Sequence, residues 1–189
     1  MEKTLLEKVA KWKGRVTLTS FVIGCSEAQE IHDLLESSGE MEASVFEGYM
    51  ARLRELCTVR EAAFDNMVVS VGRQCFAARL INELTYTGVI NYGALGTGST
   101  AVSDGQTTLT TEVKRKGIAT RARSGNTVTL RFFYSKSDTN GTYNEFGTFI
   151  DGTSTANTGQ MFNRVLTGGW VKSALEALTV TVQFDLNAS

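Results

Sequence analysis

Reactive side chains are sparse in this chain of 189 residues, and few stand at spacings that support catalysis. The only histidine, His32, lies between Ile31 and Asp33 in an expected helix. Nucleophilic catalysis by serine or cysteine needs a base positioned beside the nucleophile. The sequence offers no nucleophile-elbow motif for His32 to serve. We therefore expect His32 to pack on its helix or face solvent, and we expect no catalytic residue.

Metal and cofactor sites find little support in the spacing of the candidate ligands. The three cysteines, Cys25, Cys57 and Cys75, are far apart, whereas structural zinc sites use closely spaced pairs. Residues 138–141 (Asp-Thr-Asn-Gly) resemble the start of a calcium loop but lack its closing glutamate. We expect a hairpin turn there, buried unpaired thiols, no metal and no cofactor.

Two further motifs concern phosphates and nucleic acid. The glycines at 93, 96 and 98 lack the Lys-Ser/Thr of a nucleotide-binding loop, so we interpret them as turn glycines. Residues 114–123 hold a basic cluster, close in sequence to the aromatic residues at 132 and 134. The cluster is short and the net charge of the chain is −1, which favours a solvated strand face or a subunit contact over a nucleic-acid surface.

Three carboxylates in the second half form the one set that a hydrolase could use. Glycoside hydrolysis needs two carboxyl groups facing one cleft, and Glu112, Glu145 and Asp151 are the candidates. This reading competes with two others, a carbohydrate-binding module and a scaffold without catalysis.

The largest group of aromatic residues, at 132–134, indicates packing contacts rather than a catalytic role. Along a strand, Phe132 and Tyr134 share one face and Phe133 points to the other. A sandwich buries one face of each sheet, so one of these groups becomes a candidate contact with a partner subunit. The alternative is that these aromatic rings form a surface that binds a sugar.

The composition changes near residue 85, from Glu, Leu, Met and Arg to Thr, Gly, Val and Phe. The first half predicts helices, with a short amphipathic helix at 2–12 and a helical hairpin at 26–57. The apolar stripe of the hairpin includes Met41, Phe46, Tyr49 and Leu53. Strands are expected at 15–23 and 58–69, and a further helix at 72–84 with Cys75, Phe76, Leu80 and Leu84 facing inward.

The second half predicts strands separated by Gly, Asp-Gly and Asn-Gly turns. The expected strands are 116–122, 127–134, 145–150, 160–166 and 179–186. We therefore predict an α+β fold, with a mainly helical region at 1–85 that carries the inserted hairpin. An antiparallel β-sandwich or small barrel at 86–189 would pack against it.

Nothing in the sequence predicts export or a membrane span. Residues 1–8 are charged throughout and cannot form the apolar core of a signal peptide. No apolar run approaches the ~20 residues that cross a bilayer. We expect the chain to fold in a cytoplasm.

An ordered series of motifs carries a family resemblance. It comprises Gly96-Thr97-Gly98, Leu109-x-x-Glu112 followed by basic residues, Glu145-x-Gly147-x-Phe149 and Phe162-x-Arg164. In this order and spacing the series resembles the C-terminal module of structural proteins from tailed-bacteriophage virions, of the tail, baseplate and fibre-appendage kind. The resemblance covers about half of the chain. The hairpin at 26–57 has no counterpart in the family pattern.

The resemblance implies a non-enzymatic structural component of a virion, in the tail, baseplate, collar or fibre attachment. Such a protein would be assembled in the cytoplasm of a host bacterium, with copies of itself and other virion proteins as partners and without membrane or nucleic acid. The alternative is a receptor- or carbohydrate-binding module of an appendage. The candidate core or contact residues are Met41, Phe46, Tyr49, Leu53, Phe132, Phe133, Tyr134, Phe149 and Trp170.

Overall fold

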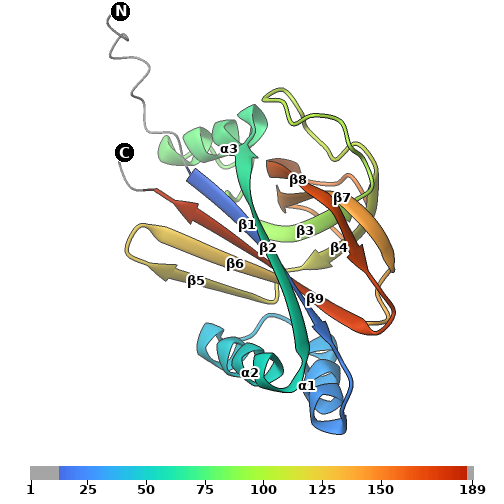
Figure 1. Cartoon of the computed structure of the whole chain (residues 1–189). Coiled ribbons are helices and arrows are strands. Elements are labelled where there is room, and N and C mark those ends of the chain that lie inside the picture. Colours follow the sequence, from blue (N-terminus) through green and yellow to red (C-terminus); the bar gives the residue numbers. More distant parts are fainter. Residues whose placement is uncertain (1–12, 187–189) are drawn as a thin grey trace, which may run out of the picture.

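In the computed structural model, which describes residues 13–186, one nine-stranded antiparallel sheet forms the body of the protein (Figure 1). Its strands are β1 (Lys13–Val22), β2 (Thr58–Val68), β3 (Ile90–Gly96), β4 (Glu112–Gly117), β5 (Thr120–Ser124), β6 (Thr127–Tyr134), β7 (Gly141–Ile150), β8 (Gln160–Lys172) and β9 (Glu176–Asp185). The helices are α1 (Ser26–Ser37), α2 (Ala43–Leu56) and α3 (Ser70–Leu80). The helix expected at 2–12 lies outside the described residues.

This architecture corrects the predicted fold class. Strands take up 46% of the chain and helices 21%, so the protein is not a helical part followed by a β-sandwich. The strand order is β4-β3-β7-β8-β2-β1-β9-β6-β5, which puts β1 and β2 in the middle of the sheet. The prediction was wrong because the composition of the first half is dominated by α1 and α2, while the two strands that flank them pair with strands more than 90 residues later.

The sheet curls into a half barrel, and its two halves are joined through one short pairing. Only Met67 and Val68 of β2 pair with β8, whereas β2 pairs with β1 over nearly its whole length. The edge strands β4 and β5 are separated by two residues, Ile118 and Ala119. The Ile118 N–H donates to a carbonyl of β3, and the Ala119 N–H donates to a carbonyl of β6. The opposite edges of the sheet therefore meet at this point.

The concave face of the curled sheet encloses the main core. Val16 and Leu18 of β1 alternate inward with fully buried side chains. From opposite halves of the sheet, the rings of Phe132 and Phe146 lie 5.8 Å apart. A Cβ on Gly93 would stand 2.8 Å from the Phe132 ring, so only glycine fits at this position of β3.

The helical hairpin covers the convex face of β1, β9 and β6 (Figure 1). It is inserted between β1 and β2, which pair as neighbours up to Val22 and Thr58. Phe46 and Leu53 of α2 pack in one buried cluster with Phe133 of β6. Phe133 is therefore covered by the same chain, and the aromatic on the second face needs no partner subunit to bury it.

Candidate functional site

A buried ion pair joins the two strands that carry the Glu-x-Gly-x-Phe and Phe-x-Arg motifs. Glu145 of β7 and Arg164 of β8 have fully buried side chains, and the Arg164 Nε donates to Glu145 Oε2 at 2.8 Å. Glu145 also accepts the backbone N–H groups of Gly98, Thr110 and Thr111 at 2.8 to 3.1 Å. One carboxylate thereby holds both ends of the long segment 97–111 against the sheet.

Arg164 holds the middle of the same segment. Its guanidinium donates to the side chain of Gln106 at 2.9 Å and to the side chain of Thr110 at 3.2 Å. A Cβ on Gly96 or Gly98 would collide with the Glu145 carboxylate, which explains the Gly-Thr-Gly sequence by close approach as well as by its turn. The Gly-Thr-Gly, Glu-x-Gly-x-Phe and Phe-x-Arg motifs thus form a single structural unit.

A second buried pair, Glu112 with Arg115, anchors another loop. Arg115 Nε donates to Glu112 Oε1 at 2.6 Å, and neither side chain is more than 3% exposed. The same guanidinium donates to the carbonyls of Thr153 and Thr158 at 3.0 Å. It also lies 4.6 Å from the centre of the Phe149 ring. The loop between β7 and β8 is therefore held down by β4.

The three carboxylates of the possible hydrolase set are each engaged in a different structural contact. Asp151 accepts the N–H of Thr87 at 2.9 Å and the hydroxyl of the same residue. Glu145 faces an arginine and several backbone N–H groups, and Glu112 faces an arginine and the backbone N–H of Asn157. All three act as loop anchors in this arrangement, rather than as a carboxylate pair turned toward one cleft.

Another buried carboxylate, that of Asp138, lies in the turn between β6 and β7. Lys114 and Lys116 of β4 approach it at 2.7 and 3.0 Å, and it accepts the N–H of Ser135 at 2.8 Å. Burial alone would raise the pKa of Asp138, but hydrogen bonds from the two lysines outweigh it and hold the pKa below its ordinary value of 3.8. The ionised carboxylate therefore stabilises the fold.

Replacing Asp138 with asparagine should lower the free energy of unfolding by roughly 1–3 kcal/mol at pH 7, because two lysines lose a charged acceptor. Since the folded pKa lies below the unfolded one, this stabilisation is full above pH 3.8 and is lost as the pH falls through the folded value. Urea unfolding across this acid range should show a weaker pH dependence for Asp138→Asn than for the wild type. The exposed Asp65→Asn serves as control, and equal pH dependence in Asp138→Asn and the wild type would contradict the assignment.

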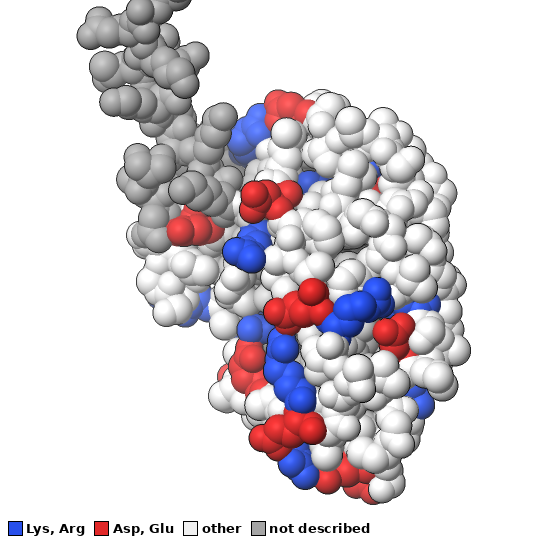
Figure 2. Space-filling view, in the orientation of Figure 1, with Lys and Arg blue, Asp and Glu red and all other residues white. Residues whose placement is uncertain are grey.

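The remaining cations of the basic cluster are also engaged within the chain. Arg121 pairs with Glu40 at the turn between α1 and α2, and Arg123 donates to the carbonyl of Gly125 at 2.8 Å. Figure 2 shows lysines and arginines interleaved with acidic residues over the lower part of the molecule, where the hairpin lies. The uncharged part of this view lies toward β7 and β8. The cluster is thus built into the fold, with both signs of charge side by side.

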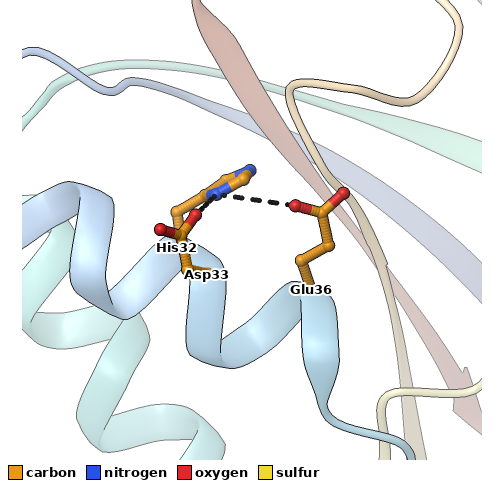
Figure 3. A group of neighbouring side chains, drawn as sticks. All are labelled: His32, Asp33 and Glu36. Carbon is orange, nitrogen blue, oxygen red and sulfur yellow. Dashed lines mark hydrogen bonds and ion pairs between the residues drawn. The ribbon is translucent and has the colours of Figure 1, made fainter.

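His32 joins the hairpin to the turn after β6. The residue is 2% exposed, and its Nε2 accepts the backbone N–H of Lys136 at 3.0 Å. Asp33 and Glu36 project from the same side of α1 toward Nδ1, at 2.9 and 4.0 Å (Figure 3). These three side chains are the one group in the described part of the chain that has the spacing of a metal site.

The hydrogen bonds of His32 argue against metal binding at this group. Because Nε2 accepts a backbone N–H, the proton of the neutral imidazole lies on Nδ1, the atom that faces both carboxylates. A metal ion needs the Nδ1 lone pair, so the residues present do not fit one. His32 instead positions α1 against β6, with its ring edge toward Phe133 at 5.8 Å.

The cysteines do not converge on a zinc site. Cys75 is buried in the main core, whereas Cys57 packs beside the hairpin cluster. Burial raises the pKa of both thiols, so neither is activated as a thiolate. Cys25 is exposed and Cys57 is half-buried, which corrects the expectation that all three would be buried.

The nine candidate core or contact residues all lie in hydrophobic clusters of this chain. Met41, Phe46, Tyr49, Leu53 and Phe133 belong to the hairpin cluster. Phe132, Tyr134 and Trp170 belong to the main core, and Phe149 to a third cluster between β3, β7, β8 and α3. The structure uses all nine in internal packing.

The sequence pattern missed an exposed apolar surface at the end of α3. Leu80 and Leu84 were expected to face inward on a helix reaching residue 84, but α3 ends at Leu80. Leu80, Ile81 and Leu84 are 73, 77 and 67% exposed, and Phe76, one turn before Leu80, is 39% exposed. The weak amphipathicity of residues 70–80 was the available signal, because a helix without a clear apolar face has no single buried side.

Comparison with protein-family models, curated proteins and solved structures found no match for this chain. Within residues 13–186, the helices are too short or too polar to span a membrane.

Proposed function

We propose that this protein is a non-enzymatic structural component of a tailed-phage virion, acting through contacts with copies of itself and with other virion proteins. The observation that carries the proposal is the exposed apolar surface of Leu80, Ile81 and Leu84. Large apolar side chains that are exposed close together in the chain are candidates for a surface that binds another protein. The virion assignment itself depends on the ordered motifs in the sequence.

The anchored loops support a role in rigid contacts. Segments 97–111 and 151–159 are held in place by buried arginine–carboxylate pairs. Ordering a loop costs about 1–2 kcal/mol per residue in backbone entropy. Loops held in one conformation lose less entropy when a partner binds them.

The direct test is to locate the protein in particles of the phage that encodes it. Particles purified on a density gradient should contain the chain in a fixed ratio to the major capsid protein, measured by quantitative mass spectrometry. If the chain stays in the soluble lysate and is absent from purified particles, the proposal is wrong.

The surface itself is tested by charge substitution. Leu80→Asp/Ile81→Asp should reduce incorporation into particles at least about tenfold, because burying two unpaired carboxylates at an interface costs several kcal/mol. The matched control is Leu175→Asp, which places the same charge on a leucine that is 65% exposed in the turn between β8 and β9. Circular dichroism should show all variants folded, and equal incorporation of all variants would contradict the role of this surface.

A further inference from the structure

Lys172 is a buried lysine whose ammonium group has no carboxylate partner in the described part of the chain. It is the last residue of β8 and is 1% exposed. Its Nζ donates to Asn140 Oδ1 at 2.7 Å and to the backbone carbonyl of Asp138 at 3.3 Å. Both acceptors are uncharged amide oxygens. A buried ammonium in this setting is costly, since no opposite charge offsets the loss of its hydration.

The nearby carboxylate of Asp138 is already engaged by other cations. Lys114 and Lys116 approach it at 2.7 and 3.0 Å, so it is not free to pair with Lys172. Burial lowers the pKa of Lys172 below its ordinary value of 10.5, although the charges of Asp138 and Glu176 act in the opposite direction. A lower pKa increases the fraction of the neutral amine, which is the nucleophilic form of lysine.

The side-chain amide of Asn140 is held at both of its ends. Its Oδ1 accepts the hydrogen bond from Lys172, and its Nδ2 donates to the backbone carbonyl of Lys136 at 3.5 Å. The carbon between these two atoms, Cγ, is bonded directly to Oδ1 and therefore lies close to the lysine nitrogen. Asn140 itself is exposed, so a group released from Cγ can pass directly into solvent.

The register of the sheet keeps the amine and the amide together. Gly141, the residue after Asn140, is the cross-strand partner of Lys172 where the β7–β8 ladder ends (Figure 1). The hydroxyl of Tyr143 in β7 donates to the carbonyl of Thr139, which holds the preceding turn against the strand. Two groups fixed side by side in this way react far faster than the same groups free in solution.

We propose that Lys172 and Asn140 form an intramolecular isopeptide bond in the folded protein. The ammonium gives up one proton, and the neutral Nζ attacks Cγ of Asn140. The Nζ–Cγ bond forms and the Cγ–Nδ2 bond breaks, while Nδ2 takes up that proton and a second one from Nζ and leaves as ammonium. A lysine ammonium and a primary amide thus become a secondary amide and an ammonium ion, which balances without any further reactant. The product leaves no buried charge at Lys172.

The bond closes the chain between residues 140 and 172 and ties the turn before β7 to the end of β8. A covalent link within one chain restrains the unfolded state, as a disulfide does. Because the bond is internal to one chain, its test is independent of incorporation into particles.

Mass spectrometry of the full-length protein tests the proposal. The wild type should be lighter than its sequence mass by one molecule of ammonia, and its tryptic digest should contain a branched peptide that joins residues 140 and 172. Lys172→Met and Asn140→Ala should each have the full sequence mass. The matched control is Asn144→Ala, which removes an asparagine side chain further along β7 and should keep both the lower mass and the branched peptide.

Two outcomes overturn the proposal. The first is a wild type of full sequence mass, with Asn140 and Lys172 recovered in separate peptides. The second is a loss of ammonia that persists in Lys172→Met, because it would come from a cyclic imide between Asn140 and Gly141. The branched peptide is measured on the wild type, so the test holds even where a variant fails to fold.

Discussion

Glu145→Ala should lower the free energy of unfolding by about 3–5 kcal/mol, because it leaves the fully buried Arg164 without its counter-charge. It also removes the acceptor of three backbone N–H groups in segment 97–111. Urea unfolding monitored by circular dichroism measures the global loss. Hydrogen exchange should show the largest local increase within residues 97–111.

Two further variants separate the effect of breaking the buried pair from the general effect of removing a charge. Arg54→Ala breaks the exposed pair with Glu61 and should cost less than about 1 kcal/mol. Glu145→Leu/Arg164→Met replaces the buried pair with apolar groups and should recover part of the loss, because no charge is left buried. A Glu145→Ala protein as stable as Arg54→Ala would show that Glu145 does not hold the segment.

Phe132→Ala should cost about 3–5 kcal/mol, since it leaves a cavity where the two halves of the curled sheet meet. The ring of Phe132 lies against Phe146 of β7 and directly over Gly93 of β3. Its loss weakens the contact that closes the half barrel. Hydrogen exchange should therefore increase in β3 and β7, although the substitution is in β6.

The adjacent residue is a matched control of the same type. Phe133→Ala removes an equally buried ring from the opposite face of β6, where the hairpin packs. It should be similarly destabilising, but its increase in exchange should fall on α1 and α2. If both variants loosen the same elements, the assignment of the two faces is wrong.

Local features of the fold were predictable from the sequence. β6 occupies residues 127–134 as expected, because a Gly-Asn turn with Gly125 at φ +55° precedes an unbroken β-rich run. The helical hairpin and its apolar stripe also lie where the spacing placed them. The opposite faces of Phe132 and Phe133 followed from strand alternation.

Features that depend on distant contacts were not predictable. β3 was missed because Gly93 and Gly96 weaken its strand propensity, and both are glycine on account of neighbours distant in sequence. The strand expected at 116–122 is divided between β4 and β5 at opposite edges of the sheet, and only closure of the sheet explains the break. The helix α2, which covers Phe133, likewise lies about 80 residues earlier in the chain.

The contacts among the motif residues were also not predictable from the sequence. Their order and spacing supported a resemblance, but the sequence alone gave no reason for their coupling. Glu145, Arg164 and Gly98 meet in one buried contact that pairs β7 with β8 and holds segment 97–111. Glu145 was a catalytic candidate in the sequence, and burial opposite an arginine makes it a structural anchor instead.

The mass of the protein in solution tests most directly the proposed role of the apolar surface of Leu80, Ile81 and Leu84 in contacts between copies. Sedimentation equilibrium at micromolar concentration should give wild-type masses well above the 20.6 kDa of one chain. Leu80→Asp/Ile81→Asp should sediment as a single chain, while Leu175→Asp keeps the wild-type mass. A wild-type mass of 20.6 kDa at every concentration would contradict the account.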